Sequence, residues 1–298
     1  MSRYLSPLRY PGGKTRMAGF LAHTFNRLPS DMDVEIWLEP FGGGAGAALK
    51  ALRDHDVPEA WIVEANPALA AFWKVAVNDP YGMAAWVENT VPSLPVFYTA
   101  RDTVEASLAG ESVDTVALAR AAFIVNRCSR SGMLVPGVGP MGGKAQSGAT
   151  KLTDRWNPAG LAARLRALAP LSDRITVHAG DGIAFLEDLP DSGIVDEVFV
   201  FADPPYIGAG NALYARGMDD DLHSRLARAL HALPHWVLTY DAHPKVVQLY
   251  EGMEIAEFDI PHSAGRSRIG KEFLVCPPHT PRASGNPLGK GSIRPALI

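Results

Sequence analysis

The most constraining feature of the sequence is an apolar segment that runs into a glycine-rich turn, a helix and a second apolar segment. Residues 34–39 have the composition of a buried strand, and the turn is Phe41-Gly42-Gly43-Gly44-Ala45-Gly46. A helix is expected over residues 47–53, a second strand over 60–64 and a second helix over 67–77. This order predicts a parallel βαβ unit with a right-handed crossover.

The same alternation returns in the second half of the chain. Strands are expected at 175–178, 198–202 and 236–239, with helices between them. Two further segments, 254–259 and 272–276, have the pattern of closing strands that pair as a hairpin at the sheet edge. The two blocks together predict a doubly wound α/β sheet.

Residues 79–174 interrupt this alternation. Helices are expected there over 115–126 and 159–168, and the loop between them, 129–151, is rich in Gly, Ser and Lys. A structureless loop of that length inside a compact domain is usually functional or disordered. We therefore expect 79–174 to be a mostly helical subdomain inserted into the sheet domain.

The remaining features of the chain favour a soluble protein. Residues 279–298 contain many Pro, Gly and Ser residues and are expected to form a flexible tail. No apolar run is long enough to span a bilayer, and the N-terminus lacks the apolar core of a signal peptide. Cys128 and Cys276 lack the spacing of a disulfide framework or a zinc site, which favours the reducing cytoplasm.

Charge is distributed unevenly along the chain. The net charge of −4 argues weakly against a nucleic-acid partner, but residues 126–174 carry eight Lys and Arg against two Asp. The first thirty residues have five basic residues and no acid, whereas acids concentrate in 181–259. Such asymmetry arises either by chance or from a phosphate-facing surface on an otherwise acidic protein.

The tetrapeptide Asp203-Pro204-Pro205-Tyr206 follows the apolar run 198–202. Open α/β sheets bind their ligands at the carboxyl ends of strands. The prolines stiffen the segment and leave its carbonyls free to accept hydrogen bonds, while Asp203 adds a charged acceptor and Tyr206 a flat aromatic face. This combination suits the amino edge of a flipped-out base. The alternative is a strand that ends in an ordinary Asp-Pro turn.

Two other strand ends carry an acid. The glycine turn fits a nucleotide-binding loop, and Gly42, Gly44 and Ala47 also satisfy the GxGxxG/A pattern of a dinucleotide site. Glu64 ends the next strand, where it could accept hydrogen bonds from two ribose hydroxyls or be a solvated strand end. Asp181 follows the strand at 175–178, and its alternative role is a helix N-cap.

The N-terminal turn is only superficially a phosphate loop. Arg9-Tyr10-Pro11-Gly12-Gly13-Lys14-Thr15 lacks the first glycine of GxxxxGK[ST], because Leu8 stands at that position. We expect instead that this turn lies over the ligand. Tyr10 would then pack against the ligand, and Lys14 would reach a carboxylate.

The chain resembles the Dam-type DNA adenine N(6)-methyltransferases in four motifs and in their order. These motifs are Tyr10-Pro-Gly-Gly-Lys14, Glu39-Pro-Phe-Gly-Gly-Gly-Ala-Gly46, Gly180-Asp181 and Asp203-Pro-Pro-Tyr206. The resemblance is to the class that places the methyl-donor loop before the target-recognition region and the DPPY motif after it. It extends from about Leu8 to Cys276. The DPPY and PGGK elements together are highly specific, whereas neither glycine turn is specific alone.

The resemblance implies a class I S-adenosylmethionine-dependent fold, with residues 1–78 and 175–278 as the catalytic domain. It implies methyl transfer from S-adenosylmethionine to an adenine flipped out of duplex DNA, without a metal. Asp203 and the Pro204 carbonyl would accept the two amino hydrogens, and Pro205 and Tyr206 would complete the catalytic element. The donor would be bound by Tyr10, Lys14, Phe41, Gly42, Gly44, Glu64 and Asp181.

The basic region is expected to contact DNA through Asn126, Arg127, Arg130, Lys144, Lys151 and Arg155. The alternative for Arg127 and Arg130 is that they are two solvated arginines. Residues 126–132 are only loosely similar to the family's Asn-Arg…Asn-Gly stretch, which leaves the target sequence open.

Smaller departures are Tyr10, where many relatives have tryptophan, and Glu64, where aspartate is frequent. Three other functions are alternatives: a methyltransferase for RNA or protein glutamine, which often has Asn at the position of Asp203; an NAD-dependent oxidoreductase; and a non-catalytic DNA-binding protein. The last two would have no use for an intact Asp203–Tyr206 element.

Overall fold

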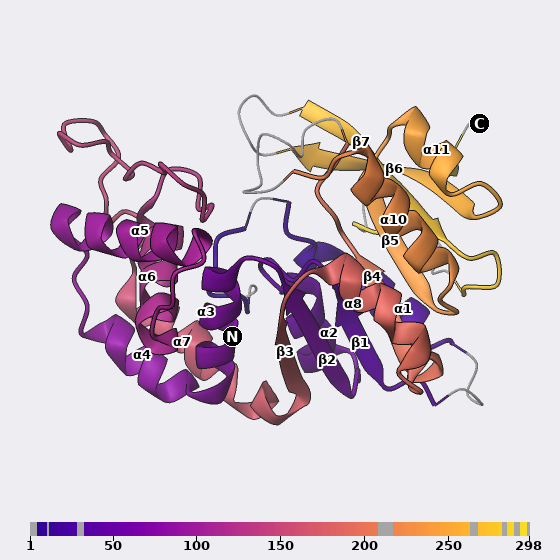
Figure 1. Cartoon of the computed structure of the whole chain (residues 1–298), viewed down its shortest axis with the longest axis horizontal. Helices are drawn as coiled ribbons and strands as arrows, with labels where there is room; N and C mark the ends of the chain where they lie inside the picture. Colours follow the sequence, from indigo (N-terminus) through magenta and orange to yellow (C-terminus); the bar gives the residue numbers. More distant parts are fainter. Residues whose placement is uncertain are drawn as a thin grey trace.

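The computed structural model describes residues 5–10, 12–28, 33–207, 217–262, 268–281, 285–288 and 293–296. Within them the chain forms one eight-stranded sheet in the order β3-β2-β1-β4-β5-β7-β6-β8 (Figure 1). The strands are β1 (Ile36–Glu39), β2 (Glu59–Glu64), β3 (Ile175–Ala179), β4 (Val198–Ala202), β5 (Trp236–Asp241), β6 (Glu254–His262), β7 (Arg268–Cys276) and β8 (Ile293–Pro295).

The pairing pattern confirms the predicted doubly wound sheet. From β3 to β5 all neighbours are parallel, whereas β7 is antiparallel to β5, and β6 is antiparallel to both β7 and β8. The strand order reverses between β1 and β4, so the segments that follow these two strands leave toward opposite faces of the sheet and open a crevice between them.

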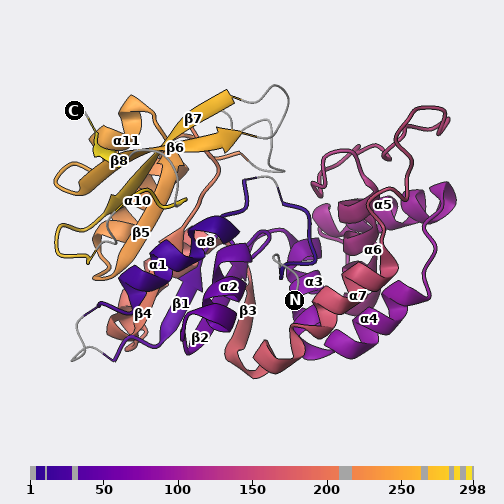
Figure 2. The same ribbon diagram turned by 180° about the vertical axis from the view of Figure 1, so that it is seen from behind.

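Helices cover both faces of the sheet because side chains alternate along each strand. Trp37 and Phe199 point to the face covered by α1 and α2 (Figure 2), and Leu38 and Val200 point to the face covered by α8 and α10 (Figure 1). The helices packed on the sheet are α1 (Ala18–Phe25), α2 (Gly46–Asp54), α3 (Pro67–Asn78), α8 (Gly182–Asp188), α10 (Asp220–His231) and α11 (Pro244–Leu249). Short 3-10 turns are η1 (Thr15–Met17), η2 (Ala169–Arg174), η3 (Leu189–Asp191) and η4 (Val195–Glu197).

A group of four helices lies beside the sheet, at the left of Figure 1: α4 (Pro80–Glu88), α5 (Leu94–Leu108), α6 (Thr115–Cys128) and α7 (Pro158–Arg166). Phe72 of α3 stacks on Phe123 of α6, with ring centroids 5.2 Å apart and an interplanar angle of 14°. Both rings belong to the hydrophobic cluster that contains Trp37 and Phe199. The interior of the helical group is therefore continuous with that of the sheet.

Two of these helices were not expected from the pattern of apolar residues. Both α4 and α5 begin with a local signal, a capping side chain followed by proline in the first turn. Asp79 accepts a hydrogen bond from the Gly82 amide at 2.8 Å, and Ser93 accepts one from Val96 at 3.4 Å. The expected loop at 129–151 contains no helix or strand, only turns and an isolated bridge between Ser129 and Pro140.

The prediction of a flexible tail from 279 onward is wrong for part of it. Residues 293–295 form β8, which pairs with Ala256–Phe258 of β6, and Ile293 packs against the hydrophobic core. The hairpin of β6 and β7 is therefore not the edge of the sheet. Composition did not predict this, because the pairing depends on an open edge that is distant in sequence. Among the described helices, none has the length and apolar character needed to cross a membrane.

We expect the continuous interior to make the helical group and the sheet unfold together. Phe123→Ala would remove a fully buried ring and lower the free energy of unfolding by about 3–5 kcal/mol. Circular dichroism and tryptophan fluorescence would report the same urea midpoint for the variant. Val116→Ala is the control on the same helix, because Val116 is 40% exposed; a separate transition for the helical group would contradict the prediction.

Candidate active site

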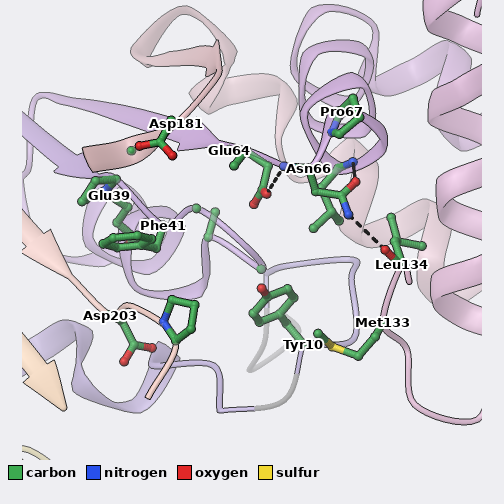
Figure 3. A pocket seen from close by; sticks show the side chains of 18 of the residues that line it. Tyr10, Glu39, Phe41, Glu64, Asn66, Pro67, Met133, Leu134, Asp181 and Asp203 are labelled. Atoms are coloured by element: carbon green, nitrogen blue, oxygen red, sulfur yellow. Dashed lines mark hydrogen bonds between the residues drawn. The ribbon is translucent and has the colours of Figure 1, made fainter. Parts of the chain in front are cut away.

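A cavity of about 790 Å³ lies at the carboxyl ends of β1, β2, β3 and β4 (Figure 3). Its walls include Glu39 at the end of β1, Glu64 at the end of β2, Asp181 after β3 and Asp203 after β4. The strand order brings these four acids together, although they are far apart in the sequence. The cavity therefore occupies the position where open α/β sheets bind ligands.

The floor of the cavity is the glycine turn between β1 and α2. The Gly42 amide donates to the Val63 carbonyl at 2.9 Å, and a Cβ at Gly42 would overlap the Ile62 side chain. Gly43 has φ +45°, and a Cβ there would lie 2.7 Å from the Tyr10 ring. Glycine is required at both positions, because the turn lies against β2 on one side and under Tyr10 on the other.

Tyr10 is held in this position by Asn126 at the end of α6. The Asn126 side chain accepts from the Arg9 amide at 2.8 Å and donates to the carbonyls of Arg9, at 2.8 Å, and Gly132, at 2.6 Å. Asn126 is fully buried. The structure thus gives Asn126 a structural role in place of the expected DNA contact, because its polar atoms are used inside the protein.

Glu64 is buried and is not a solvated strand end. Its carboxylate accepts one hydrogen bond from the Gly43 amide and one from the Asn66 amide, each 2.8 Å long. Burial raises the pKa of Glu64, and the backbone hydrogen bonds oppose this rise. Asn66 also donates to the Leu134 carbonyl at 3.1 Å (Figure 3), which ties this wall to the loop after α6.

Asp181 is the N-cap of α8, as its alternative role predicted. One of its oxygens, Oδ1, accepts from the amides of Ile183 at 2.8 Å and Ala184 at 2.9 Å. Asp181 also lines the cavity, together with the ring of Phe41. Capping and ligand binding are compatible, because both capping bonds go to the same carboxylate oxygen.

Glu39 is an acid of the cavity that we did not single out from the sequence. Its Oε1 accepts from the Ala48 amide at 2.7 Å and from the Trp37 indole at 3.3 Å. Burial is the main cause that raises the pKa of Glu39 to about 8, with a smaller contribution from the charge of Asp203. Its position at the last residue of β1, before the glycine turn, was the available signal.

The charges of the cavity suit a cation. Among the described residues that line it, Lys14 is the only lysine or arginine, against the carboxyls of Glu39, Glu64, Asp181 and Asp203. Apolar walls from Phe41, Pro67, Leu134 and Ile183 complete it. A ligand with a positive charge and a flat apolar part fits such a site. The described residues contain no group of His, Cys, Asp and Glu that could hold a metal ion.

The Asp203–Tyr206 element lies at the mouth of the cavity, directly after β4. The side chain of Asp203 is 23% exposed, and its Oδ1 accepts from the Thr239 hydroxyl of β5 at 2.7 Å. The Lys14 ammonium lies 2.8 Å from Oδ1 and 2.9 Å from Oδ2. Asp203 and Pro205 both border the cavity.

Lys14 was expected to reach a carboxylate, and in the structure that carboxylate belongs to Asp203, while Lys14 also lines the cavity. An ammonium has three protons, and here it donates to Asp203, to the Gly12 carbonyl at 3.2 Å and to the Tyr206 hydroxyl at 2.9 Å. Tyr206 in turn donates to Glu272 of β7 at 2.5 Å. Glu272 is the second residue of this site that sequence reasoning missed.

The expected basic residues lie at the end of α6 and in the loop that follows. Arg130, Lys144, Lys151 and Arg155 are exposed. Arg127 is partly buried and donates twice to the Arg155 carbonyl, at 2.7 and 3.0 Å. Burial, with the nearby charges of Arg164, Arg9 and Arg155, lowers the pKa of Arg127 to about 10. The region is therefore strongly positive around Arg127.

The raised pKa of Glu39 predicts a pH-dependent loss of stability. An unfolded glutamate has a pKa of about 4.3, so the folded state favours the neutral form, and this advantage disappears as the pH rises toward about 8. Relative to Glu39→Gln, the wild type should lose on the order of 3 kcal/mol between pH 5 and 8.5. Urea unfolding across this range measures the difference, and parallel pH curves for the two proteins would contradict it. Buried histidines titrate in both proteins and cancel.

Comparison with known proteins identifies the family to which the chain belongs. A comparison with curated proteins found no match. The family model described as D12 class N6 adenine-specific DNA methyltransferase matches residues 10–264, a range that includes the cavity, the helical group and the Asp203–Tyr206 element. Enzymes of this class use S-adenosylmethionine as the methyl donor, a cation that suits the acidic cavity. The chain therefore belongs to the D12 class of N6 adenine-specific DNA methyltransferases, which transfer a methyl group from S-adenosylmethionine to adenine in DNA.

Proposed function

We propose that the cavity at the strand ends holds the methyl donor and that an adenine flipped out of duplex DNA docks against Asp203–Tyr206. The observation that carries this proposal is the placement of Asp203, which borders the cavity and is partly exposed at its mouth. A group at that position can contact a base that enters from outside while the donor lies within. A few kcal/mol are needed to extrude the base.

Asp203 and the Pro204 carbonyl would accept the two hydrogens of the adenine amino group. That nitrogen is a weak nucleophile, because its lone pair is delocalised into the ring, and two acceptors favour a pyramidal nitrogen. The sulfonium of the bound donor supplies the methyl group. Lys14 and Thr239 would hold the Asp203 carboxyl group in one orientation, and Tyr206 would stack on the base. Orientation and electrostatics then carry the catalysis.

On the donor side, Glu64 would accept hydrogen bonds from the ribose hydroxyls. Each of its oxygens already holds one backbone amide, which fixes the carboxylate in one orientation. Asp181 and Phe41 would contact the adenine end of the donor, and Glu39 its positively charged end. The backbone at Gly42 and Gly44 would approach the donor closely beneath Tyr10.

Residues 79–174 would form the target-recognition region and bind the DNA duplex. Support comes from the positive region around Arg127 and from the exposure of Arg130, Lys144, Lys151 and Arg155. Arg127 would contribute mainly by holding the Arg155 backbone. Asn126 acts indirectly, because it fixes Arg9 and therefore Tyr10.

Replacement of Asp203 tests the adenine site. Asp203→Ala should lower kcat at least about a hundredfold, because the acceptor for the amino group is lost. The dissociation constant for S-adenosylhomocysteine should change by less than about threefold, since Asp203 lies at the mouth of the cavity. Transfer of tritiated methyl to unmethylated plasmid DNA measures the first quantity, and calorimetry the second. Asp188→Ala, an exposed acid on α8, is the control. Near-normal turnover by Asp203→Ala would reject the assignment.

Replacement of Arg130 tests the DNA contact. If Arg130 binds a phosphate, Arg130→Ala should weaken binding to all duplexes and reduce the slope of log affinity against log salt by about one. If it binds a base, the preference at one position of the target should relax instead. Arg166→Ala removes the same charge where it is already paired with Glu88 at 2.6 Å, so it is the matched control. If Arg130→Ala matches Arg166→Ala both in salt slope and in base preference, the DNA contact lies elsewhere.

A further inference from the structure

Glu272 lies in the middle of β7, opposite Asp241 of β5 and Phe258 of β6. It is 2% exposed, so its carboxyl group is almost completely removed from water. Nothing in its local sequence indicates a role in the site. A buried acid normally needs a partner, because an unpaired charge in the interior is costly.

Its partners are Tyr206 and Lys14. The Tyr206 hydroxyl donates to Oε1 of Glu272 at 2.5 Å, and the Lys14 ammonium lies 3.7 Å from Oε2. Because Lys14 can only donate, the Tyr206 oxygen accepts from Lys14 and its single proton points to Glu272. The direction of both hydrogen bonds is thereby fixed: Lys14 donates to Tyr206, and Tyr206 donates to Glu272.

This series of hydrogen bonds holds the Asp203–Tyr206 element at both of its ends. Lys14 contacts both ends of the element, the Asp203 carboxylate and the Tyr206 hydroxyl, and the two prolines between them transmit a displacement of one end to the other. The Lys14 ammonium also lies 5.3 Å from the centre of the Tyr206 ring. Thr239 anchors the Asp203 end, and Glu272 anchors the Tyr206 end.

We infer that Glu272 is a positioning residue for the adenine site, which holds the ring of Tyr206 at the angle needed to stack on the flipped base. The inference rests on the proposed docking of adenine against Asp203–Tyr206. Glu272 acts through the Tyr206 hydroxyl and touches neither the base nor the donor.

Hydrogen bonding, and not the charge of Glu272, is the property that this role requires. Among the described residues, the titratable groups that act on this carboxyl are Lys14, Tyr206, and the carboxyl groups of Asp203 and Asp241. Burial raises the pKa of Glu272 to about 7, and Lys14 opposes the rise. Either protonation state of the carboxyl group offers an oxygen to Tyr206. Glutamine offers the same acceptor without the charge.

The test compares Glu272→Ala, Glu272→Gln and Tyr206→Phe in methyl transfer to unmethylated plasmid DNA. Glu272→Ala should lower kcat/KM for DNA about ten- to a hundredfold, while S-adenosylhomocysteine binds within about threefold of wild type. Glu272→Gln should restore activity to within about fivefold of wild type and leave the pH profile of kcat between 6 and 8 unchanged. Lys271→Ala is the control on β7, because the Lys271 side chain is 56% exposed and pairs with Glu257 of the neighbouring strand β6.

The double variant separates positioning from general destabilisation. If Glu272 acts through the hydroxyl of Tyr206, Glu272→Ala should have little further effect in a Tyr206→Phe background. Additive losses, an inactive Glu272→Gln or an altered pH profile would each overturn the inference. Tyr206→Phe probes the same bond even where Glu272→Ala folds poorly. An active Asp203→Ala enzyme in the same assay would reject the proposed docking of adenine, whereas full activity of Glu272→Ala alone would reject only the role of Glu272.

Discussion

The buried ammonium of Lys14 is the interaction on which the arrangement of the active site depends. Burial alone would lower the pKa of Lys14, but the carboxylates of Asp203 and Glu272 raise this pKa by more than burial lowers it. The side chain therefore remains charged. A charge with 5% of its side chain exposed is stable only when all its protons find acceptors. Those acceptors come from the N-terminal turn and from the segment after β4, and the ion pair therefore joins two distant parts of the chain.

A second link connects the helical group to the donor cavity. The cavity is lined not only by the sheet but also by Ser107, Leu108 and Gly110 at the end of α5 and by residues 132–136 after α6. Asn66 bonds to the Leu134 carbonyl, and Asn126 holds both Gly132 and the segment that carries Tyr10. The region assigned to DNA and the walls of the donor site are thus parts of one hydrogen-bonded structure. A displacement at the end of α6 would therefore also move Tyr10 and change its contact with the glycine turn beneath it.

Much of this could be predicted where the signal is local. The strand 198–202 was predicted at its observed residues, and the acids at the ends of β2, β3 and β4 meet in one cavity because parallel strands place their carboxyl ends together. Asn126 was expected to contact DNA but is buried against Arg9 and Gly132, because a sequence shows that a polar residue is present but not what is folded against it. Glu272 was not identified, since its partners lie 66 and 258 positions away in the chain. Glu39 belongs to the glycine-rich motif of the sequence, but its burial is evident only in the folded structure.

The short strand β8 has a consequence for how copies of this protein behave toward one another. β6 is nine residues long, and one of its sides pairs with β7. Its other side would be a row of open backbone donors and acceptors, which is the usual template for unwanted pairing between chains. β8 occupies that side at Ala256–Phe258 and ends in Pro295, whose nitrogen carries no hydrogen to extend the sheet. The C-terminal segment therefore covers part of this edge, so that fewer backbone groups of β6 remain open to pairing with a second copy of the protein.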